Sequence, residues 1–482
     1  MLVSIEFGKI YSKKKGPIEM RSRKTKITAC LLALVIIISA VSLTSCSSYY
    51  SDLLEFYRDI NEARDPQNRD EPAEDSNSPS KPTTPSAPDE DASNDTVDPD
   101  IMDENFSTSD VDVPEINGGG DTVYAVAQGL RSVVSIYCSH EVTSGGTSIW
   151  NPTPSTQTYY SSGSGVVYKT EDDGSAFIVT NYHVVYEKGS NTENHISDKI
   201  FIYLYGMVNE KYAIPATFVG GSANYDIAVL RVDKSEVMKK AIERGSVKAV
   251  QIGDSDGVLP GQTAIAIGNP ATEELGGISV TGGIISVESE YISMTALDSS
   301  GTVEMRVIRT DAPVNSGNSG GGLFNDAGEL IGIVNAKIMS SDVENIGYAI
   351  PSSVARAVAD NVIYHCYNKD CESVQRAMLG ITVTTSGLST YYDEESGLLI
   401  RAEQIMVYEV TAGGIGEKIL KTGDIIKSLT VGGRTINVTR QYHLIDAMLD
   451  VRPGETVSMT VVRDGIETTV SAELTKDCLT SY

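Results

Sequence analysis

The most informative stretch of the chain is Thr310-Asp311-Ala312-Pro313-Val314-Asn315-Ser316-Gly317-Asn318-Ser319-Gly320-Gly321-Gly322. Ser319 stands between Gly-Asn and Gly-Gly, and glycine tolerates backbone conformations that a Cβ atom forbids. Such a backbone can turn N–H groups inward around a hydroxyl, which is what an acyl-transfer enzyme needs at its nucleophile. A plain glycine-rich turn between two strands is the alternative, because apolar runs flank the stretch. The rest of the chain distinguishes the two interpretations.

Short runs of β-forming residues occupy much of the chain around this stretch. In chain order they are residues 132–137, 163–168, 176–180, 200–204, 227–232, 263–267, 282–287, 307–310, 330–334 and 347–350. Many short strands joined by glycine-rich turns, with almost no helix, predict antiparallel barrels or a sandwich. The length of the region favours two barrels rather than one. We expect helices over 121–131 and from Ser352 to about Tyr367, and a long polar loop over 139–160.

Two further polar residues have positions that suit catalysis. His183, one of five histidines, follows a predicted strand, and Asp226 opens the apolar run 227–232. Alone, each has a structural explanation, as a histidine of the core and as a turn residue before a strand. Together with Ser319 they come in the order His, Asp, Ser of the chymotrypsin-type triad. A serine hydroxyl needs an imidazole to remove its proton, and the imidazole needs a carboxylate on its other nitrogen.

Five motifs make the assignment specific. They are Thr-Asn-x-His-Val-Val at 180–185, Asp-Ile-Ala-Val-Leu at 226–230, Gly-Asn-Pro at 268–270, Thr-Asp-Ala-x-x-Asn-x-Gly-Asn-Ser-Gly-Gly at 310–321 and Gly-Tyr-Ala-Ile-Pro at 347–351. In this order they resemble the HtrA/Deg family of serine proteases. The resemblance implies a mostly β protease domain of two six-stranded antiparallel β-barrels, as in chymotrypsin.

The resemblance also assigns roles to individual residues. It implies that Ser319 is the nucleophile, that His183 is the general base and acid, and that Asp226 orients the imidazole. The backbone N–H groups of Gly317 and Ser319 would form the oxyanion hole. Substrates would be unfolded or damaged exported proteins, and the resemblance implies a homotrimer.

The sequence departs from the family pattern beside the nucleophile. Ser316 and Gly322 stand where the family usually has proline, and both changes remove rigidity, so we expect a loop that orders less readily. A proteolytically weak chaperone or peptide-binding scaffold is therefore the alternative function. The residues before the nucleophile include no acid to receive Lys or Arg, since Asp311 matches a structural position. We expect cleavage after small or medium aliphatic residues.

A second module follows the predicted helix. Its runs include Met378-Leu379-Gly380-Ile381, Gly423-Asp424-Ile425-Ile426 and Arg452-Pro453-Gly454-Glu455, with a predicted helix over 441–450 and a polar surface loop over 389–396. These features resemble one PDZ domain of the kind attached to HtrA proteases. Such a domain binds peptides by strand addition, and its loop N–H groups take a carboxyl terminus. Leu379, Gly380 and Ile381 are the candidates for that loop.

The amino end has the pattern of an export signal. Basic residues precede an apolar run over 27–43, and the run ends in Leu43-Thr44-Ser45-Cys46. The last four residues resemble the lipobox of bacterial lipoproteins, in which the signal is cut before Cys46 and that cysteine is acylated. The alternative is an uncleaved transmembrane anchor. Met20 is an alternative start. Both interpretations place the rest of the chain on the extracytoplasmic face of the cell membrane.

Composition completes the expected organisation. The formal net charge of −27 argues against a nucleic-acid partner. Residues 65–117 are rich in Pro, Ser, Asp, Glu and Asn and bury too little apolar surface to fold, although an irregular ordered domain is the alternative. The cysteines form no framework and lack metal-ligand spacing with histidine, although Cys366 and Cys371 are close enough to pair. We expect no cofactor and no metal.

We therefore expect five segments. They are an export signal or membrane anchor at 1–46, a disordered acidic linker at 47–118, a trypsin-like protease domain at 119–370, a PDZ domain at 371–477 and a tail at 478–482.

Overall fold

The computed structural model describes residues 122–144, 154–207, 210–269, 277–297, 301–315, 317–338, 346–369, 371–394 and 397–482. By its internal contacts the chain separates into two units, Met1–Lys81 and Pro82–Tyr482, and every described residue belongs to the second unit. The predicted signal at 1–46, with Cys46, and the predicted linker at 47–118 lie outside the described residues. Within the described part of the chain, no helix combines the length and the apolar composition needed to cross a membrane.

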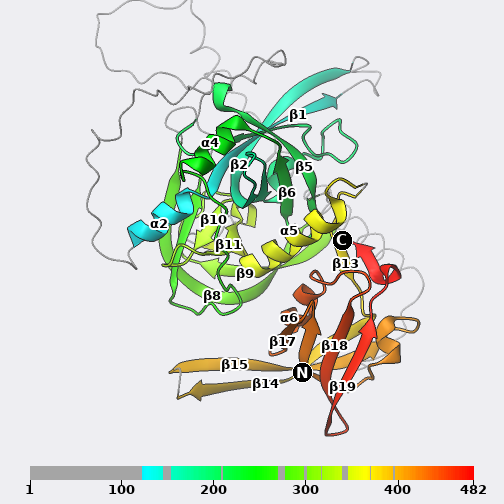
Figure 1. Ribbon diagram of the computed structural model, residues 1–482. Helices are drawn as coiled ribbons and strands as arrows, with labels where there is room; N and C mark the ends of the chain where they lie inside the picture. The colour runs from blue at the N-terminus through cyan, green and yellow to red at the C-terminus, as the bar shows by residue number, and fades with distance from the viewer. Residues whose placement is uncertain are drawn as a thin grey trace, which may run out of the picture. The chain divides into compact units, whose positions relative to one another are not determined.

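The first six strands close into a barrel in the order β1-β2-β3-β6-β5-β4 (Figure 1). Helix α2 (Thr122–Leu130) precedes it and confirms the helix predicted over 121–131. The strands are β1 (Val133–Ser144), β2 (Ser155–Thr170), β3 (Ala176–Thr180), β4 (Lys199–Tyr203), β5 (Ile214–Ser222) and β6 (Ile227–Val232). Strands β3 and β6 are buried along their whole length, and all of their residues are apolar except Thr180 and Arg231.

The predicted loop over 139–160 is wrong at both ends. β1 continues to Ser144 and β2 begins at Ser155, and the two pair in register from Val133↔Val166 to Ser144↔Ser155. Cross-strand contacts favour this extension: the hydroxyls of Thr143 and Thr156 are 2.8 Å apart, and the rings of Tyr137 and Tyr160 stack with centroids 5.5 Å apart. The polar composition of the segment therefore reflects exposed strands rather than a loop.

Three short helical segments lie within or beside the first barrel. They are α3 (Tyr182–Val185), the 3-10 turn η3 (Glu210–Tyr212) and α4 (Glu236–Glu243). Helix α4 was not predicted. Serine is a common N-cap residue, so Ser235 was a signal in the sequence for the start of this helix. In the structure its hydroxyl accepts a hydrogen bond from the N–H of Met238 at 3.2 Å.

The next six strands close into a barrel in the order β10-β11-β12-β9-β8-β7. They are β7 (Thr263–Gly268), β8 (Ser279–Thr295), β9 (Thr302–Thr310), β10 (Gly322–Phe324), β11 (Leu330–Val334) and β12 (Gly347–Pro351), with the 3-10 turn η4 (Ala336–Ile338) after β11. Helix α5 (Ser352–Cys366) confirms the predicted helix. It packs against β5 and β6 of the first barrel and against β11 and β12 of the second.

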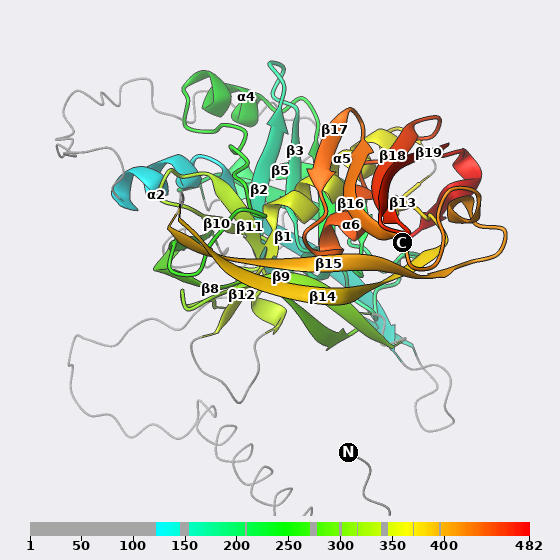
Figure 2. The ribbon, with the colours of Figure 1, turned by 90° about the horizontal axis from the view of Figure 1, so that it is seen from below.

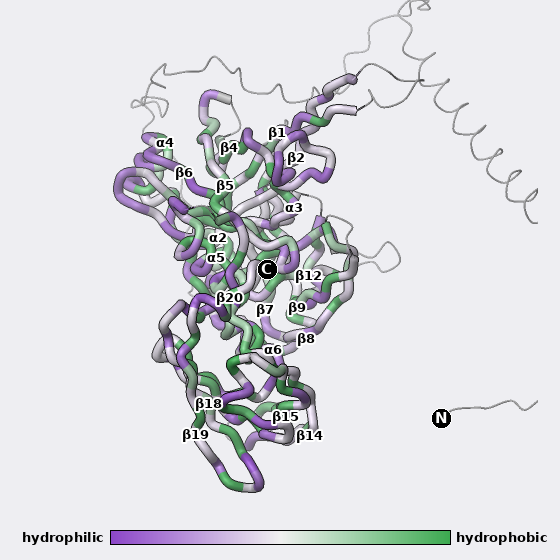
Figure 3. The backbone as a smooth tube through the Cα atoms, turned by 90° about the vertical axis from the view of Figure 1, so that its right-hand side faces the viewer, coloured by the Kyte–Doolittle hydropathy of each residue, from purple (hydrophilic) through white to green (hydrophobic). Residues whose placement is uncertain are grey.

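One hydrophobic cluster joins the two barrels. It contains Val179 and Val229 of the first barrel, Ile267 and Ile333 of the second, and Val358 of α5. Figure 3 shows hydrophobic residues concentrated along the strands and hydrophilic residues in many of the connections. Apolar side chains of both barrels and of α5 belong to this one cluster. Their packing therefore fixes the two barrels relative to each other.

A mostly antiparallel module follows α5. Its main sheet has the order β14-β15-β16-β18-β19, β17 pairs with β16, and a separate pair is formed by β13 and β20. The elements are β13 (Gln375–Ala377), β14 (Ile381–Asp393), β15 (Leu398–Val410), η5 (Ile415–Lys418), β16 (Ile425–Val431), β17 (Arg434–Asn437), α6 (Gln441–Ala447), β18 (Thr456–Arg463), β19 (Ile466–Glu473), η6 (Lys476–Cys478) and β20 (Leu479–Ser481). The predicted mostly β composition of the folded region is therefore confirmed.

The predicted loop over 389–396 is also too long. β14 and β15 form a long two-stranded ribbon, which Figure 2 shows edge to edge, and they pair as far as Asp393↔Leu398. The pairing register shifts at Thr382/Val383 and Thr385/Gly387, and the two strands stay paired beyond these shifts.

The segment between the second barrel and this module contacts the first barrel. Cys366 and Cys371 form a disulfide, which the sequence allowed but did not require. Beyond it, the N–H of Gly221 donates to the carbonyl of Glu372 at 2.9 Å, and the N–H of Val374 donates to the carbonyl of Gly221 at 3.2 Å. The chain thus passes along the end of β5 before it enters the last module.

An ion cluster joins the second barrel to α6. The Arg306 guanidinium on β9 pairs with Asp256 at 2.6 Å and with Asp446, and it stacks over the Tyr442 ring at 3.5 Å from the ring centroid. Burial raises the pKa of Asp446 from 3.8 to about 6, although Arg306 opposes that shift. This carboxyl therefore changes charge close to neutral pH.

Candidate active site

His183 and Asp226 are in direct contact. His183 lies in the one-turn helix α3, directly after β3. Its ring Nδ1 donates to Oδ2 of Asp226 at 2.7 Å, and its backbone N–H donates to Oδ1 at 2.9 Å. Because a carboxylate accepts from Nδ1, that nitrogen carries the hydrogen and Nε2 remains an acceptor. The carboxylate therefore fixes both the orientation and the tautomer of the imidazole.

Asp226 is fully buried, and its side-chain oxygens accept several hydrogen bonds. Besides the two bonds from His183, Oδ2 accepts from Nδ2 of Asn335 at 2.7 Å. The backbone carbonyl of Asp226 accepts from Nδ2 of Asn181 at 3.0 Å. The residue has φ +49°, in the left-handed region that aspartate tolerates better than most residues. Such strain is held where surrounding contacts over-determine the conformation, as they do here.

The aromatic residues next to this pair are neutral. Tyr182 and Tyr225 immediately precede His183 and Asp226, and burial raises the pKa of each to about 12. Tyr225 also accepts a hydrogen bond from Arg376 of β13 at 3.1 Å. Neither phenol therefore carries charge near the His–Asp pair at neutral pH.

Ser319 lies beside the pair but is not bonded to it. Its Oγ accepts from the N–H of Ala336 at 3.1 Å, and among the described residues no acceptor takes its hydroxyl hydrogen. A Cβ at Gly163 would lie 2.8 Å from the Val184 side chain and 3.1 Å from the carbonyl oxygen of Ser319. Since Val184 follows His183 in the chain, Gly163 lies between the backbone of Ser319 and helix α3.

One short segment contacts both the acid and the hydroxyl. Asn335 and Ala336 are consecutive, and they bond Asp226 and Ser319 respectively. The three side chains that the sequence singled out therefore lie within one small region. The structure brings His183 and Asp226 together, and among the described residues the hydroxyl hydrogen of Ser319 has no acceptor. In enzymes without substrate such catalytic bonds are often long or misaligned.

The backbone around Ser319 presents unused donors. Gly317 has φ +95°, a conformation that favours glycine. Among the described residues, neither the N–H of Gly317 nor that of Ser319 donates to a partner, whereas the N–H of Asn318 donates to the carbonyl of Asn315 at 3.0 Å. Two N–H groups without an acceptor among the described residues, next to the Ser319 hydroxyl, are suited to bind a developing oxyanion.

Gly322 has a packing role. It is buried at the start of β10, and a Cβ there would lie 2.3 Å from the Phe324 ring. Close packing against Phe324 leaves no room for a side chain at residue 322, which explains why proline is absent there. Ser316, the other departure, lies outside the described residues.

The described residues just before Ser319 in the chain are mostly uncharged. Asp311 accepts the N–H of Ile284 at 2.7 Å, which agrees with its predicted structural role. Val314 is buried, and a Cβ at Gly347 would lie 2.7 Å from its Cγ2. Val314 and the buried Ala312 carry no charge, and Asp311 is the nearest carboxylate before Ser319 in the chain.

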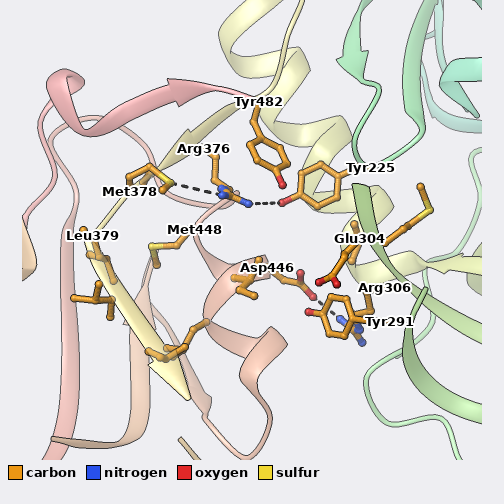
Figure 4. A pocket seen from close by; sticks show the side chains of 18 of the residues that line it. Tyr225, Tyr291, Glu304, Arg306, Arg376, Met378, Leu379, Asp446, Met448 and Tyr482 are labelled. Atoms are coloured by element: carbon orange, nitrogen blue, oxygen red, sulfur yellow. Dashed lines mark hydrogen bonds and ion pairs between the residues drawn. The ribbon is translucent and has the colours of Figure 1, made fainter. Parts of the chain in front are cut away.

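Leu379, Gly380 and Ile381 line a cavity of about 340 Å³. Leu444 and Met448 of α6 form part of the same cavity. Figure 4 shows Leu379 and Met448 on one side and Tyr225, Tyr291 and Arg306 on the other. Gly380 has φ +70°, and neither its N–H nor that of Leu379 donates to a described residue. These donors remain available to a ligand.

Asn335 was missed by the sequence reasoning. It follows the apolar run of β11 directly, is fully buried, and makes its bond to a residue 109 positions away. A buried amide at the end of a core strand was the only available signal, and nothing local identifies its partner.

Comparison with known proteins places the chain among proteases. The family model "Trypsin-like peptidase domain" matches residues 163–333. "Serine protease Do-like HtrA" of Bacillus subtilis is 33% identical over 318 residues, which cover 65% of this chain and 63% of that protein. "Serine protease Do-like HtrA" of Lactococcus lactis subsp. cremoris is 33% identical over 328 residues, which cover 66% and 71%.

Two further matches complete the comparison. "Probable periplasmic serine endoprotease DegP-like" of Rhizobium meliloti is 33% identical over 317 residues, covering 65% of this chain and 53% of that protein. The solved structure of the HtrA-type protease AlgW with a tripeptide is 27% identical, covers 75% of this chain and 98% of that one, and has a TM-score of 0.46. The chain thus spans less than two thirds of the length of the Bacillus subtilis protein.

Proposed function

This chain belongs to the HtrA family of trypsin-like serine proteases, and on that premise we propose that it is a serine endopeptidase of protein quality control. Its substrates would be unfolded or damaged exported proteins. Ser319 would be the nucleophile, His183 the general base and acid, and Asp226 the residue that orients the imidazole. The N–H groups of Gly317 and Ser319 would form the oxyanion hole.

The reaction follows from these roles. Nε2 of His183 takes the hydroxyl proton of Ser319 as Oγ attacks the substrate carbonyl carbon. The carbonyl oxygen becomes negative and accepts hydrogen bonds from Gly317 and Ser319. The imidazolium, held by Asp226, then gives its proton to the leaving amine, and the amide C–N bond breaks to leave an acyl-enzyme. Water, activated by the same imidazole, hydrolyses the ester and restores the hydroxyl.

The hydrogen bond of 2.7 Å between His183 Nδ1 and Asp226 Oδ2 is the observation that carries this proposal. It leaves Nε2 of His183 as an acceptor, which is the atom that we propose acts as the base. A fluorophosphonate probe tests it. We expect the wild-type protein and Ser255→Ala to be labelled and Ser319→Ala to remain unlabelled. Labelling of Ser319→Ala at the wild-type rate would show that another residue is the nucleophile.

Cleavage should follow small or medium aliphatic residues. The support is the uncharged set of Ala312 and Val314, with Asp311 committed to the N–H of Ile284. Profiling with a peptide library would check this directly, since cuts after Arg or Lys would contradict it. Val314→Asp should shift the preference toward basic residues, because it places a carboxylate among the otherwise uncharged residues before the nucleophile.

The carboxyl-terminal module would be a PDZ domain that recognises peptide carboxyl termini. The N–H groups of Leu379 and Gly380, which have no acceptor among the described residues, lie at a cavity lined by both apolar and charged side chains, and they support this proposal. A peptide that ends in a free carboxylate should bind there, and its carboxyl-amidated form should bind more weakly. Ile381→Asp should abolish binding of the free peptide, because it places a negative charge beside the carboxylate.

A weakly proteolytic scaffold is the second candidate. One observation favours it: Ser319 accepts from Ala336 and makes no hydrogen bond to His183. Absence of probe labelling, even after addition of a peptide that binds the carboxyl-terminal module, would support this candidate. Suppression of client aggregation by Ser319→Ala would then measure the remaining activity.

The cellular location is proposed from the amino end alone. Its basic and apolar segments and Cys46 support an extracytoplasmic protein tethered to the cell membrane, either by lipid or by an uncleaved anchor. Mass spectrometry of the mature amino terminus distinguishes the two. We also propose a homotrimer, which analytical ultracentrifugation would test.

A further inference from the structure

Ser164 connects the nucleophile loop to the first barrel. It lies on β2 and is fully buried. Its backbone N–H donates to the carbonyl of Ser319 at 2.8 Å, and its hydroxyl donates to the carbonyl of Gly317 at 2.7 Å. The same hydroxyl accepts from the N–H of Asn269 at 2.8 Å. The hydroxyl therefore uses its hydrogen and one lone pair, and it joins three segments that are far apart in sequence.

The two carbonyls bound by Ser164 belong to particular residues. Gly317 and Ser319 are the residues whose N–H groups we assign to the oxyanion hole. Each peptide unit is planar, so fixing a carbonyl also fixes the N–H of the following residue. The N–H groups after these two carbonyls are themselves bonded, Asn318 to Asn315 at 3.0 Å and Gly320 to Val334 at 3.0 Å. The two peptide units on either side of the Ser319 N–H are therefore held at both ends.

The loop is also pressed against Ser164. A Cβ at Gly320 would lie 2.1 Å from the carbonyl oxygen of Ser164. That same carbonyl accepts the hydroxyl of Thr180 at 2.7 Å, and Thr180 is the last residue of the strand before the histidine helix. One residue thus relates the histidine strand to the backbone that surrounds the nucleophile. A loop built from Gly317, Gly320 and Gly321 has little conformational preference of its own, so external bonds must set its shape.

We propose that Ser164 is a positioning residue for the oxyanion hole, which it orients by holding the carbonyl of Gly317. This inference rests on the proposed protease function. Removing the hydroxyl leaves the Ser164 N–H bond to Ser319 intact. The loss therefore falls on the Gly317–Asn318 peptide unit, which lies in the chain between the two N–H groups assigned to the hole, and on the N–H of Asn269. The substrate itself does not contact Ser164, so ground-state binding should change little while transition-state binding falls.

The test compares Ser164→Ala with a matched control. Ser255 is also buried, and its hydroxyl accepts the N–H of Ser353 at 3.0 Å and lies 3.1 Å from the Ser353 hydroxyl. Ser255→Ala therefore removes a similar buried hydroxyl away from the nucleophile. With a chromogenic peptide amide, we expect Ser164→Ala to lower kcat by about 10- to 100-fold, less than the loss of an entire oxyanion-hole donor. KM should stay within about threefold, and Ser255→Ala should match the wild type.

A second readout isolates the oxyanion. A peptide aldehyde forms a hemiacetal with the nucleophile, and its oxyanion occupies the hole, whereas a product peptide makes no such adduct. The affinity of Ser164→Ala for the aldehyde should fall by the same factor as kcat/KM, and its affinity for the product should not change. A purely structural role would lower both affinities, or neither. Ser164→Cys is nearly isosteric and keeps a weak donor, so it should give an intermediate kcat and serves if Ser164→Ala does not fold.

The outcomes separate this inference from the proposed function. If the wild type is labelled by the fluorophosphonate through Ser319 and Ser164→Ala retains wild-type kcat and aldehyde affinity, the role of Ser164 is refuted and the protease remains. An unlabelled wild-type protein would overturn the protease and the role of Ser164 together.

Discussion

Replacing Asn335 with alanine should lower kcat while leaving the binding of substrate unchanged. Oδ2 of Asp226 accepts two hydrogen bonds of equal length, 2.7 Å from His183 and 2.7 Å from Asn335. The substitution removes one of them from a fully buried carboxylate. A hydrogen bond to a charged group contributes about 1.5–3 kcal/mol. If the whole contribution is realised when the imidazolium forms, kcat should fall by about 10- to 150-fold, since about 1.4 kcal/mol corresponds to a factor of ten.

The assay is steady-state hydrolysis of a chromogenic peptide that ends in alanine or valine. Asn325→Ala is the matched control, because its Nδ2 also donates to a carboxylate, Oε2 of Glu329 at 2.9 Å, away from the nucleophile. Asn335→Asp keeps the size of the side chain but places a second carboxylate against Asp226, so its kcat should fall further than that of the alanine variant. Urea unfolding of each variant corrects for any loss of folded protein.

Two results would refute the reasoning. A kcat of Asn335→Ala within twofold of the wild type would mean that the amide does not support the charged pair. A loss confined to KM would mean that Asn335 acts on substrate binding and not through Asp226.

Three other perturbations have defined outcomes. Because burial raises the pKa of Asp446 from 3.8 to about 6, the folded state binds this proton more tightly, so its contribution to stability is present below pH 4 and is lost as the pH rises through 6. In urea titrations, the free energy of unfolding of the wild type minus that of Asp446→Asn should decline by up to about 3 kcal/mol between pH 4 and 7, and a flat difference would contradict the assignment. The paired Cys366→Ser and Cys371→Ser substitution should cost about 2 kcal/mol, since the closed loop is short, and dithiothreitol should destabilise the wild type but not this variant. Gly320→Ala should nearly abolish fluorophosphonate labelling, because φ is +82° and the new Cβ would lie 2.1 Å from the carbonyl of Ser164; labelling at half the wild-type rate or more would show that the loop can adapt.

The sequence predicted structure best where a candidate site residue lies next to an apolar run in the same short segment. The placement of His183 after β3 and of Asp226 before β6 was readable, because each lies at the boundary of a continuous apolar run. Helix α5 was readable because its apolar residues recur at helical spacing. Hairpin lengths were not, because residues 139–144 and 155–160 are polar, and only their pairing partner makes them strands.

The site required contacts that a linear reading does not contain. Asn335 reaches Asp226 across 109 positions, and Ser164 reaches Gly317 across 153. Neither residue belongs to a local pattern that names its partner. The direction of the Ser319 hydroxyl, toward Ala336, likewise depends on the fold of the second barrel and not on the glycines around it.

The course of residues 371–374 bears on how the protease could be isolated from the module that follows it. The sequence predicts that the protease domain ends at residue 370. Glu372 and Val374 nevertheless form backbone hydrogen bonds with Gly221, which lies five residues before Asp226. A shortened protein that stops at residue 370 would lose these two hydrogen bonds to β5, close to Asp226. Its activity should therefore be low, and that loss could be wrongly ascribed to the missing module. A protein that ends after Val374 would lack the following module but keep both backbone hydrogen bonds to Gly221.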